Sequence, residues 1–247
     1  MRFLQLVQQQ MGLSRRRAET LIKAGRVTLD GAQMSNPYLE IEPKQTTALA
    51  LDGKTVEIAP IAAGVYKYYK PVGMLCSFAD PHHHHAMGKV LRRPELKGYK
   101  IVGRLDRDAE GLLLLTNDGG LLNHLAHPRY EVEKVYHVWV PKVLRFRQSF
   151  DVFRQMKDGI EDQGERLVLV RGAIVQRTAT NTLVKLVLTE GKKHEVKRLC
   201  RHFGWTVQRL IRVEMAGVHL GPLKPGELHA LTKPEIKALY QRVRQPL

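Results

Sequence analysis

Apolar residues recur at helical spacing in the first quarter of the chain. In the stretch RFLQLVQQQMG they fall three or four positions apart, which predicts a short helix that ends at Gly12. The next stretch, LSRRRAETLIKAGRVTLDG, predicts a second helix, because Ser14 is a good N-cap and Gly25 can end a helix in a left-handed turn. The residues RVTL then alternate as a short strand, and Asp30-Gly31 is a tight-turn signal.

Beyond residue 64, short apolar runs alternate with helical stretches. The apolar runs predict strands at 65–71, 100–106, 112–116, 134–140, 166–175 and 182–190. Helices are predicted at 119–127, 148–159 and 193–204. Successive strands come too close together for a regular alternation of parallel strands and crossover helices. We therefore expect an α+β fold with a mainly antiparallel mixed sheet flanked by helices.

A run of small, uncharged residues, APIAAG at 59–64, separates the two patterns and is typical of a linker. It divides the chain into a small N-terminal domain over 1–58, with two helices and short strands, and a larger domain over 65–247. With 247 residues the chain is long enough to bury a core in each part.

The composition is that of a soluble globular protein, with 43% hydrophobic residues and a mean hydropathy of -0.29. No apolar run approaches the ~20 residues of a membrane-spanning helix. The glutamine-rich N-terminus is unlike a signal peptide, so we expect a cytoplasmic protein with no membrane partner. Cys76 and Cys200 provide neither a disulfide framework nor a zinc-binding spacing.

The net charge indicates a polyanionic partner. Forty Lys and Arg residues face 24 Asp and Glu residues, which leaves +16, and each phosphate that such a protein neutralises releases counterions and adds affinity. Nucleic acid fits better than an anionic membrane, because no helix with a large apolar face accompanies the charge. The second predicted helix and its flank have a basic face suited to a phosphate backbone or to solvent, formed by Arg15, Arg16, Arg17, Lys23 and Arg26.

The segment GRLDRDAEGLLLLTNDGG at 103–120 sets five charged residues against four consecutive leucines. The leucines suit a strand buried on both faces or a short core segment, and Asn117-Asp118-Gly119 supplies the turn that ends it. The charged residues must then lie in a loop at the edge of the core, where a carboxylate is partly desolvated and a nearby arginine keeps it ionised. A nucleophilic aspartate needs that combination, although spacing alone favours a turn with surface ion pairs.

Metal binding fits less well. Asp106 and Asp108 are two residues apart, as in many phosphoryl-transfer sites, but no further acidic cluster completes a two-metal centre. The run PHHHH at 81–85 has no accompanying Cys or acidic ligand, and consecutive histidines cannot all face one ion. A partly charged loop near the nucleic acid is the better interpretation, and we expect no metal site.

In four ordered motifs the chain resembles the RsuA-type family of rRNA pseudouridine synthases. The motifs are the segment at 103–120, KPVGM at 70–74, HPRYEVEKVYHV at 127–138 and EGKKHEVKRLCRHFGWTVQRLIRV at 190–213. The stretch SRRRAETLIKAGRVTLDG resembles the alpha-L RNA-binding domain, which also occurs in a small-subunit ribosomal protein. The resemblance covers nearly the whole chain and implies an isomerase that converts a specific uridine of ribosomal RNA to pseudouridine.

The resemblance implies roles for particular residues. Asp106 is the catalytic aspartate, and Arg104 pairs with it and helps to hold the flipped nucleotide. Tyr136 stacks on the uracil, and Lys197 forms a buried ion pair with Asp106. Without the family, Tyr136 reads as a core tyrosine and Lys197 as a solvated helix cation. Contacts to RNA are expected from basic residues of both domains, namely Arg15, Arg16, Arg17, Lys23, Arg26, Lys70, Lys134, Lys192, Lys193, His194 and Arg198.

The implied reaction needs no cofactor. The base is detached from the sugar, turned and rejoined through ring carbon 5, so no atom or electron is gained or lost. The uridine must leave its stack at a cost of a few kcal/mol, and aromatic stacking returns roughly 1–3 kcal/mol. Three routes stay open for the carboxylate: attack on the ribose, attack on ring carbon 6, or assistance to the departing base. Tyr136 is a candidate base for the proton on carbon 5.

Two positions depart from the family pattern. Ala109 stands where many members have Thr or Ser. Glu195 replaces the Gln that is common in the branch acting on the small subunit, and this difference favours the branch acting on the large subunit. The competing hypothesis is a non-catalytic RNA-binding ribosome assembly factor, which would leave Asp106, Tyr136 and Lys197 without a shared purpose. The expected partner is ribosomal RNA, naked or within an assembly intermediate, and the family's usual state is a monomer.

Overall fold

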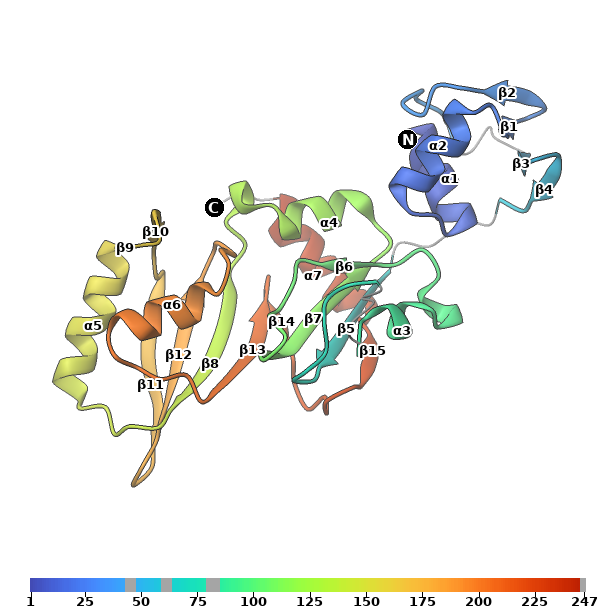
Figure 1. Cartoon of the computed structure of the whole chain (residues 1–247). Helices are drawn as coiled ribbons and strands as arrows, with labels where there is room; N and C mark the ends of the chain where they lie inside the picture. The colour runs from blue at the N-terminus through green and yellow to red at the C-terminus, as the bar shows by residue number, and fades with distance from the viewer. Residues whose placement is uncertain (43–47, 59–63, 79–84, 245–247) are drawn as a thin grey trace. The chain divides into compact units, whose positions relative to one another are not determined.

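The computed structural model describes residues 1–42, 48–58, 64–78 and 85–244 (Figure 1). The chain divides into two compact units. The first comprises residues 1–63 together with 91–99, and the second comprises 64–90 and 100–247. The segment 91–99 therefore packs with the N-terminal unit, whereas the sequence placed it in the larger domain.

The N-terminal unit packs two helices on a small antiparallel sheet. Its elements are α1 (Phe3–Met11), α2 (Arg15–Lys23), β1 (Val27–Leu29), β2 (Ala32–Met34), β3 (Leu49–Leu51), β4 (Lys54–Val56) and the 3-10 helix η1 (Pro94–Leu96). The strand order is β2-β1-β3-β4. The predicted helix ends are confirmed: the Ser14 hydroxyl accepts a hydrogen bond from the Arg17 amide at 3.3 Å, and Gly12 and Gly25 have φ of +67° and +66°.

Within the described residues, the larger unit contains a nine-stranded sheet. Seven of its strands follow the order β11-β12-β8-β13-β7-β5-β15, with β6 paired to β7 and β14 paired to β13. The bounds are β5 (Val65–Lys70), β6 (Lys100–Val102), β7 (Glu110–Thr116), β8 (Lys134–Val140), β11 (Arg171–Arg177), β12 (Thr182–Leu188), β13 (Arg209–Met215), β14 (Val218–His219) and β15 (Leu228–Ala230). The pairing is antiparallel except between β13 and β7. The predicted α+β fold with a mainly antiparallel mixed sheet is confirmed.

Strand β7 is the buried centre of this sheet. Residues 112–115, the four leucines, are fully buried, as the unbroken apolar run predicts. The strand pairs with β13 at Glu110 and Gly111 and with β6 over its last three residues. At Gly111 φ is +103°, and an added Cβ would lie 2.4 Å from the Arg212 carbonyl oxygen. Glycine is therefore required where β7 and β13 come together.

Helices cover the sheet in two groups (Figure 1). The bounds are α3 (Gly88–Leu91), α4 (Gly119–Ala126), η2 (Pro128–Tyr130), α5 (Phe146–Asp158), α6 (Glu195–His202) and α7 (Lys233–Arg244). One apolar cluster joins α5 and α6 to β8 and β12, through residues such as Met156, Leu199 and Val138. A second cluster joins α4 and α7 to β5 and β7, through residues such as Leu125 and Leu239.

Several elements differ from the sequence-based expectation. The predicted strand 166–175 is divided between β10 (Glu165–Leu167), which forms a separate hairpin with β9 (Ile160–Asp162), and β11. Strand β13 was not predicted, because charged residues interrupt its apolar positions. Most of the predicted linker 59–64 and of the histidine run 81–85 lies outside the described residues. Among the helices that are described, none has the length and apolar character needed to cross a membrane.

Candidate active site

Asp106 lies in the loop 103–109 between β6 and β7. Leu105 and Ala109 are buried on either side of it, in the same apolar cluster as Tyr136. The Leu105 amide donates to the Cys76 sulfur at 3.3 Å, and the Ala109 amide donates to the Asp106 carbonyl oxygen at 3.2 Å. These anchors fix the loop at the edge of the core, as predicted, while the Asp106 side chain stays 27% exposed.

Lys70 ties the same loop to the end of β5. Its side chain is fully buried, and Nζ donates to the carbonyl oxygens of Ala109 at 2.7 Å, Pro71 at 3.0 Å and Arg107 at 3.4 Å. Burial lowers the pKa of the Lys70 ammonium, although nearby acidic groups oppose this. The Lys70 ammonium is enclosed by protein carbonyls, so in this structure it supports the loop. Its expected contact with RNA stays a prediction.

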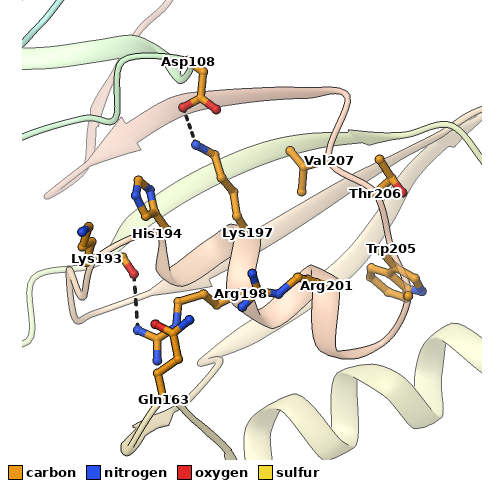
Figure 2. A pocket seen from close by; sticks show the side chains of 11 residues that line it. Asp108, Gln163, Lys193, His194, Lys197, Arg198, Arg201, Trp205, Thr206 and Val207 are labelled. Atoms are coloured by element: carbon orange, nitrogen blue, oxygen red, sulfur yellow. Dashed lines mark hydrogen bonds and ion pairs between the residues drawn. The ribbon is translucent and has the colours of Figure 1, made fainter.

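The carboxylate of Asp106 is held by two side chains from the α6 region. Lys197 Nζ lies 3.1 Å from Asp106 Oδ2, and His194 Nδ1 lies 2.9 Å from the same oxygen. Lys197 also forms an ion pair with Asp108, as Figure 2 shows. The ion pair between Lys197 and Asp106 that the family resemblance implies is therefore present, with Lys197 23% exposed.

Helix α6 positions both partners of Asp106. Its other face is held in the core by Val196, Leu199 and Cys200, which are all buried. His194 is the N-cap and has φ of +52°, a backbone conformation that is uncommon outside glycine. Such residues persist where the surrounding structure holds them, and here the imidazole is bound to Asp106.

Asp108 shares the Lys197 ammonium with Asp106. Burial raises the pKa of the Asp108 carboxyl, but the hydrogen bond and charge of Lys197 outweigh this and lower it overall. A metal ion bound by Asp106 and Asp108 would lie between the two carboxylates, and the Lys197 ammonium occupies that position. Over the described part of the chain, no group of three or more potential His, Cys, Asp or Glu ligands converges on one point.

Tyr136 and Arg212 are cross-strand neighbours on β8 and β13. Tyr136 is buried, and burial raises the pKa of its hydroxyl, while Arg212 opposes the shift by its charge and a hydrogen bond. Tyr136 also belongs to the apolar cluster that contains Leu105 and Ala109, on either side of Asp106. The structure thus brings Asp106, Lys197 and Tyr136 into one neighbourhood.

Arg104 does not pair with Asp106. Its side chain is exposed, and it forms no ion pair with any carboxylate of the described residues. In this structure the contacts to Asp106 Oδ2 come from Lys197 and His194. The pairing of Arg104 with Asp106 stays a prediction. An exposed arginine two residues from the candidate nucleophile stays available to a substrate.

The cations expected to bind RNA in the larger unit differ in their surroundings. Arg198 is 5% exposed and binds the carboxylates of Asp162 and Glu165, so it joins α6 to the β9–β10 hairpin. Its expected contact with RNA stays a prediction. Lys134 Nζ donates to the carbonyl oxygens of Val132 at 2.9 Å and Thr189 at 2.7 Å. Burial lowers the pKa of Lys134 to about 8.

The remaining cations near α6 are more accessible. Lys192 is half-buried, with Nζ 2.5 Å from the Arg166 carbonyl oxygen and an ion pair to Glu190. Lys193 and His194 are exposed. These two are the best placed of the expected RNA contacts in this unit, because they flank the site of Asp106.

In the N-terminal unit, Arg15, Arg16 and Arg17 are exposed along the first turn of α2. Lys23 pairs with Glu19 at 2.7 Å, and the Arg26 guanidinium makes two contacts with Asp52 at 2.7 and 2.5 Å. Exposed pairs of this kind contribute little to stability, so they do not prevent contact with phosphate. The RNA role of this face stays a prediction.

Sequence reasoning missed three buried polar residues that support the site. Arg212 is almost fully buried, and its Nε donates to the Leu112 carbonyl oxygen at 2.8 Å, which joins β13 to β7. Glu110 accepts from Tyr69 at 2.8 Å and from Arg209 at 2.5 Å. The partners of Arg212 and Glu110 lie far away in the sequence. The sequence could have indicated these residues only as charged positions within apolar strands.

The third missed residue, Glu195, is a buried carboxyl at the start of α6. Its Oε2 accepts from the Lys192 amide at 3.3 Å, while Oε1 has no hydrogen-bond partner among the described residues. Burial, together with the charge of Glu190, raises the pKa of Glu195 to about 7.

Glu195→Gln is expected to change how stability depends on pH. The folded protein holds the Glu195 proton up to pH ~7, whereas the unfolded chain loses it near pH 4.5, so the free energy of unfolding falls as pH rises between these values. The variant lacks this contribution, which is roughly 3 kcal/mol. Urea unfolding of both proteins at pH 5 and pH 8 measures it, and parallel pH profiles for the two proteins would contradict the expectation.

Comparison with known proteins agrees with this architecture. The model of the RNA pseudouridylate synthase family matches residues 65–202. The chain is 36% identical over 213 residues to ribosomal large subunit pseudouridine synthase B of Yersinia pestis, covering 84% of this chain and 64% of that protein. It is 30% identical over 232 residues to ribosomal small subunit pseudouridine synthase A of Vibrio cholerae, covering 94% and 96%. A crystal structure of a pseudouridylate synthase superposes with a TM-score of 0.63 at 25% identity, covering 97% of this chain and 99% of the other.

With a family match over more than half of its length and these relatives, the chain belongs to the RNA pseudouridylate synthase family. It is an enzyme, an isomerase that acts on uridine in RNA, as the resemblance predicts.

Proposed function

We propose that this enzyme converts a specific uridine of ribosomal RNA to pseudouridine, with Asp106 as the nucleophile on a flipped-out nucleotide. The observation that carries the proposal is the environment of Asp106. Its loop is anchored in the core, and its Oδ2 is bound by Lys197 at 3.1 Å and His194 at 2.9 Å. A carboxylate that is positioned, partly dehydrated and paired with a cation is suited to nucleophilic catalysis.

The reaction exchanges one bond for another. The bond between ribose carbon 1′ and uracil nitrogen 1 breaks, the base turns, and carbon 5 bonds to the sugar. The proton leaves carbon 5, and nitrogen 1 gains one, so atoms and electrons balance without a cofactor. The Asp106 carboxylate forms a transient covalent bond to the ribose or to ring carbon 6. The Lys197 ammonium balances the negative charge of the carboxylate before that bond forms.

Tyr136 and Arg104 are assigned to the bound nucleotide. Extruding the uridine costs a few kcal/mol, and stacking on an aromatic ring returns roughly 1–3 kcal/mol. The Tyr136 ring suits this contact, and its hydroxyl is a candidate acceptor for the carbon 5 proton, directly or through water. Arg104 is an exposed residue of the same loop and suits a contact to the nucleotide phosphate.

The ribosomal RNA assignment is supported by two relatives that are named for the ribosome, one for each subunit. The exposed arginines of α2 then supply affinity for the phosphate backbone, and the N-terminal unit serves as an alpha-L RNA-binding domain. We expect a cytoplasmic enzyme that acts as a monomer, on naked RNA or on an assembly intermediate.

Carbodiimide mapping of ribosomal RNA from cells that lack the gene tests the proposal. Pseudouridine retains the carbodiimide adduct and stops reverse transcription, so one stop present in wild-type RNA is expected to disappear. Expression of the wild-type protein is expected to restore it. An unchanged set of stops would contradict the proposal and favour a non-catalytic role in ribosome assembly.

A further inference from the structure

A cavity of about 770 Å³ extends from the catalytic loop along one side of α6 (Figure 2). Asp108, His194 and Lys197 line the end that belongs to the candidate active site. The cavity continues past them to Arg201 and to the segment 204–207, which follows α6 and leads into β13. No step of the reaction described above uses this far end.

One wall of the cavity is cationic. Lys197 and Arg201 are four residues apart, so they share one face of α6 over a rise of about 6 Å, and His194 is the N-cap of the same helix. Arg201 is 65% exposed, and its contact with Asp162 is 3.6 Å long. An exposed, long ion pair is weak. Arg201 is therefore available to a phosphate, which a guanidinium can bind with two parallel hydrogen bonds.

The floor at the far end is apolar. Trp205 is buried and packs edge-to-face on Phe153, with ring centroids 5.7 Å apart. Val207 is half-buried against the same apolar cluster. A cationic wall beside an apolar floor fits a nucleotide better than a free inorganic anion, because a nucleotide presents both a phosphate and an apolar base face. The volume lies within the ~300–1,000 Å³ typical of small-molecule sites.

We infer that this cavity binds the nucleotide adjacent to the target uridine, with its phosphate on Arg201 and its base or sugar against Trp205 and Val207. The inference rests on the proposed function, because the uridine at Asp106 determines where the strand enters the cavity. A base-paired neighbour cannot enter without leaving its own helix. The substrate is therefore a uridine in a loop or bulge whose neighbour is also unpaired.

Arg201→Gln tests the cationic contact, and Arg154→Gln is its matched control. Arg154 lies on α5 of the same unit, is 67% exposed and has a similarly long ion pair, 3.8 Å, to Asp151. With a single-stranded oligouridylate 12-mer as probe, Arg201→Gln is expected to raise Kd roughly five- to tenfold near 0.1 M salt. It is also expected to reduce the slope of log K against log salt by about 0.7. Arg154→Gln is expected to leave both values unchanged.

Uncharged methylphosphonate linkages locate the phosphate. The probe is an RNA fragment that carries the mapped uridine, with one linkage at a time neutralised within two nucleotides of it. At one position the replacement is expected to weaken binding of the wild-type protein but to have no further effect on Arg201→Gln, since both changes remove the same contact.

Two results would overturn the inference: equal affinities and salt slopes for Arg201→Gln and Arg154→Gln, or additive losses at every linkage tested. In either case the wild-type protein still forms pseudouridine, which separates this failure from failure of the proposed function. If the proposed function fails instead, the wild-type protein forms no pseudouridine, whatever the outcome of the binding comparison.

Discussion

Asp106→Asn is expected to abolish pseudouridine formation, with a loss in kcat of at least about 10⁴-fold, as found when the nucleophile of a covalent mechanism is removed. The amide has nearly the shape of the carboxylate but neither its charge nor its nucleophilicity. The loop should keep its conformation, because Leu105, Ala109 and Lys70 hold it through contacts that do not involve the Asp106 side chain. Nucleoside analysis measures the product, and filter binding should show RNA affinity within about twofold of the wild-type value.

Asp108→Asn is the matched control for this variant. Asp108 is two residues from Asp106 and binds the same lysine, Lys197, but the Asp108 side chain is 69% exposed. We expect a loss in kcat of less than about tenfold, because a weak, solvated interaction is removed. The reverse outcome, with Asp108→Asn inactive and Asp106→Asn active, would show that the wrong carboxylate has been assigned.

Lys197→Met is expected to lower kcat by about 10²- to 10³-fold while the chain stays folded. Lys197 binds Asp106 and Asp108 together, so its removal leaves two neighbouring carboxylates without their shared cation. Mutual repulsion then favours protonation or displacement of Asp106, and a loss of this size corresponds to a reaction barrier roughly 3–4 kcal/mol higher. Methionine preserves much of the packing of the lysine stem.

Lys197→Arg separates this charge effect from a packing effect. The guanidinium keeps the positive charge near both carboxylates, and we expect recovery to within about tenfold of the wild-type kcat. Thermal unfolding of the two variants should be similar. If Lys197→Arg is as inactive as Lys197→Met and both unfold at lower temperature, the residue acts through stability and not through the carboxylate.

The sequence predicted the candidate site better than the network that supports it. An unbroken run of leucines suits a strand buried on both faces or a short core segment, and the structure shows the buried strand, with the charged loop before it. The motif resemblance then identified the ion pair between Lys197 and Asp106. Both depend on local pattern or on recognisable motifs.

Burial and long-range pairing could not be predicted in the same way. Lys70 and Arg198 look like other surface cations in the sequence, because nothing near them reveals the carbonyls and carboxylates that enclose them. Arg212 lies in β13, which is a central strand of the sheet. The charged residues of β13 interrupt its apolar pattern, so the sequence did not predict this strand. His194 was expected to contact RNA, and its contact with Asp106 depends on a left-handed backbone conformation that no spacing rule predicts.

Release of tritium from uracil carbon 5 tests the central claim most directly. Ribosomal RNA labelled with [5-³H]uridine, taken from cells that lack the gene, would be incubated with the purified protein and no added cofactor. Because the new bond to the sugar forms at carbon 5, the wild-type protein should release one equivalent of tritium to water per RNA molecule, and Asp106→Asn should release none. No release by the wild-type protein, or equal release by both proteins, would contradict the account.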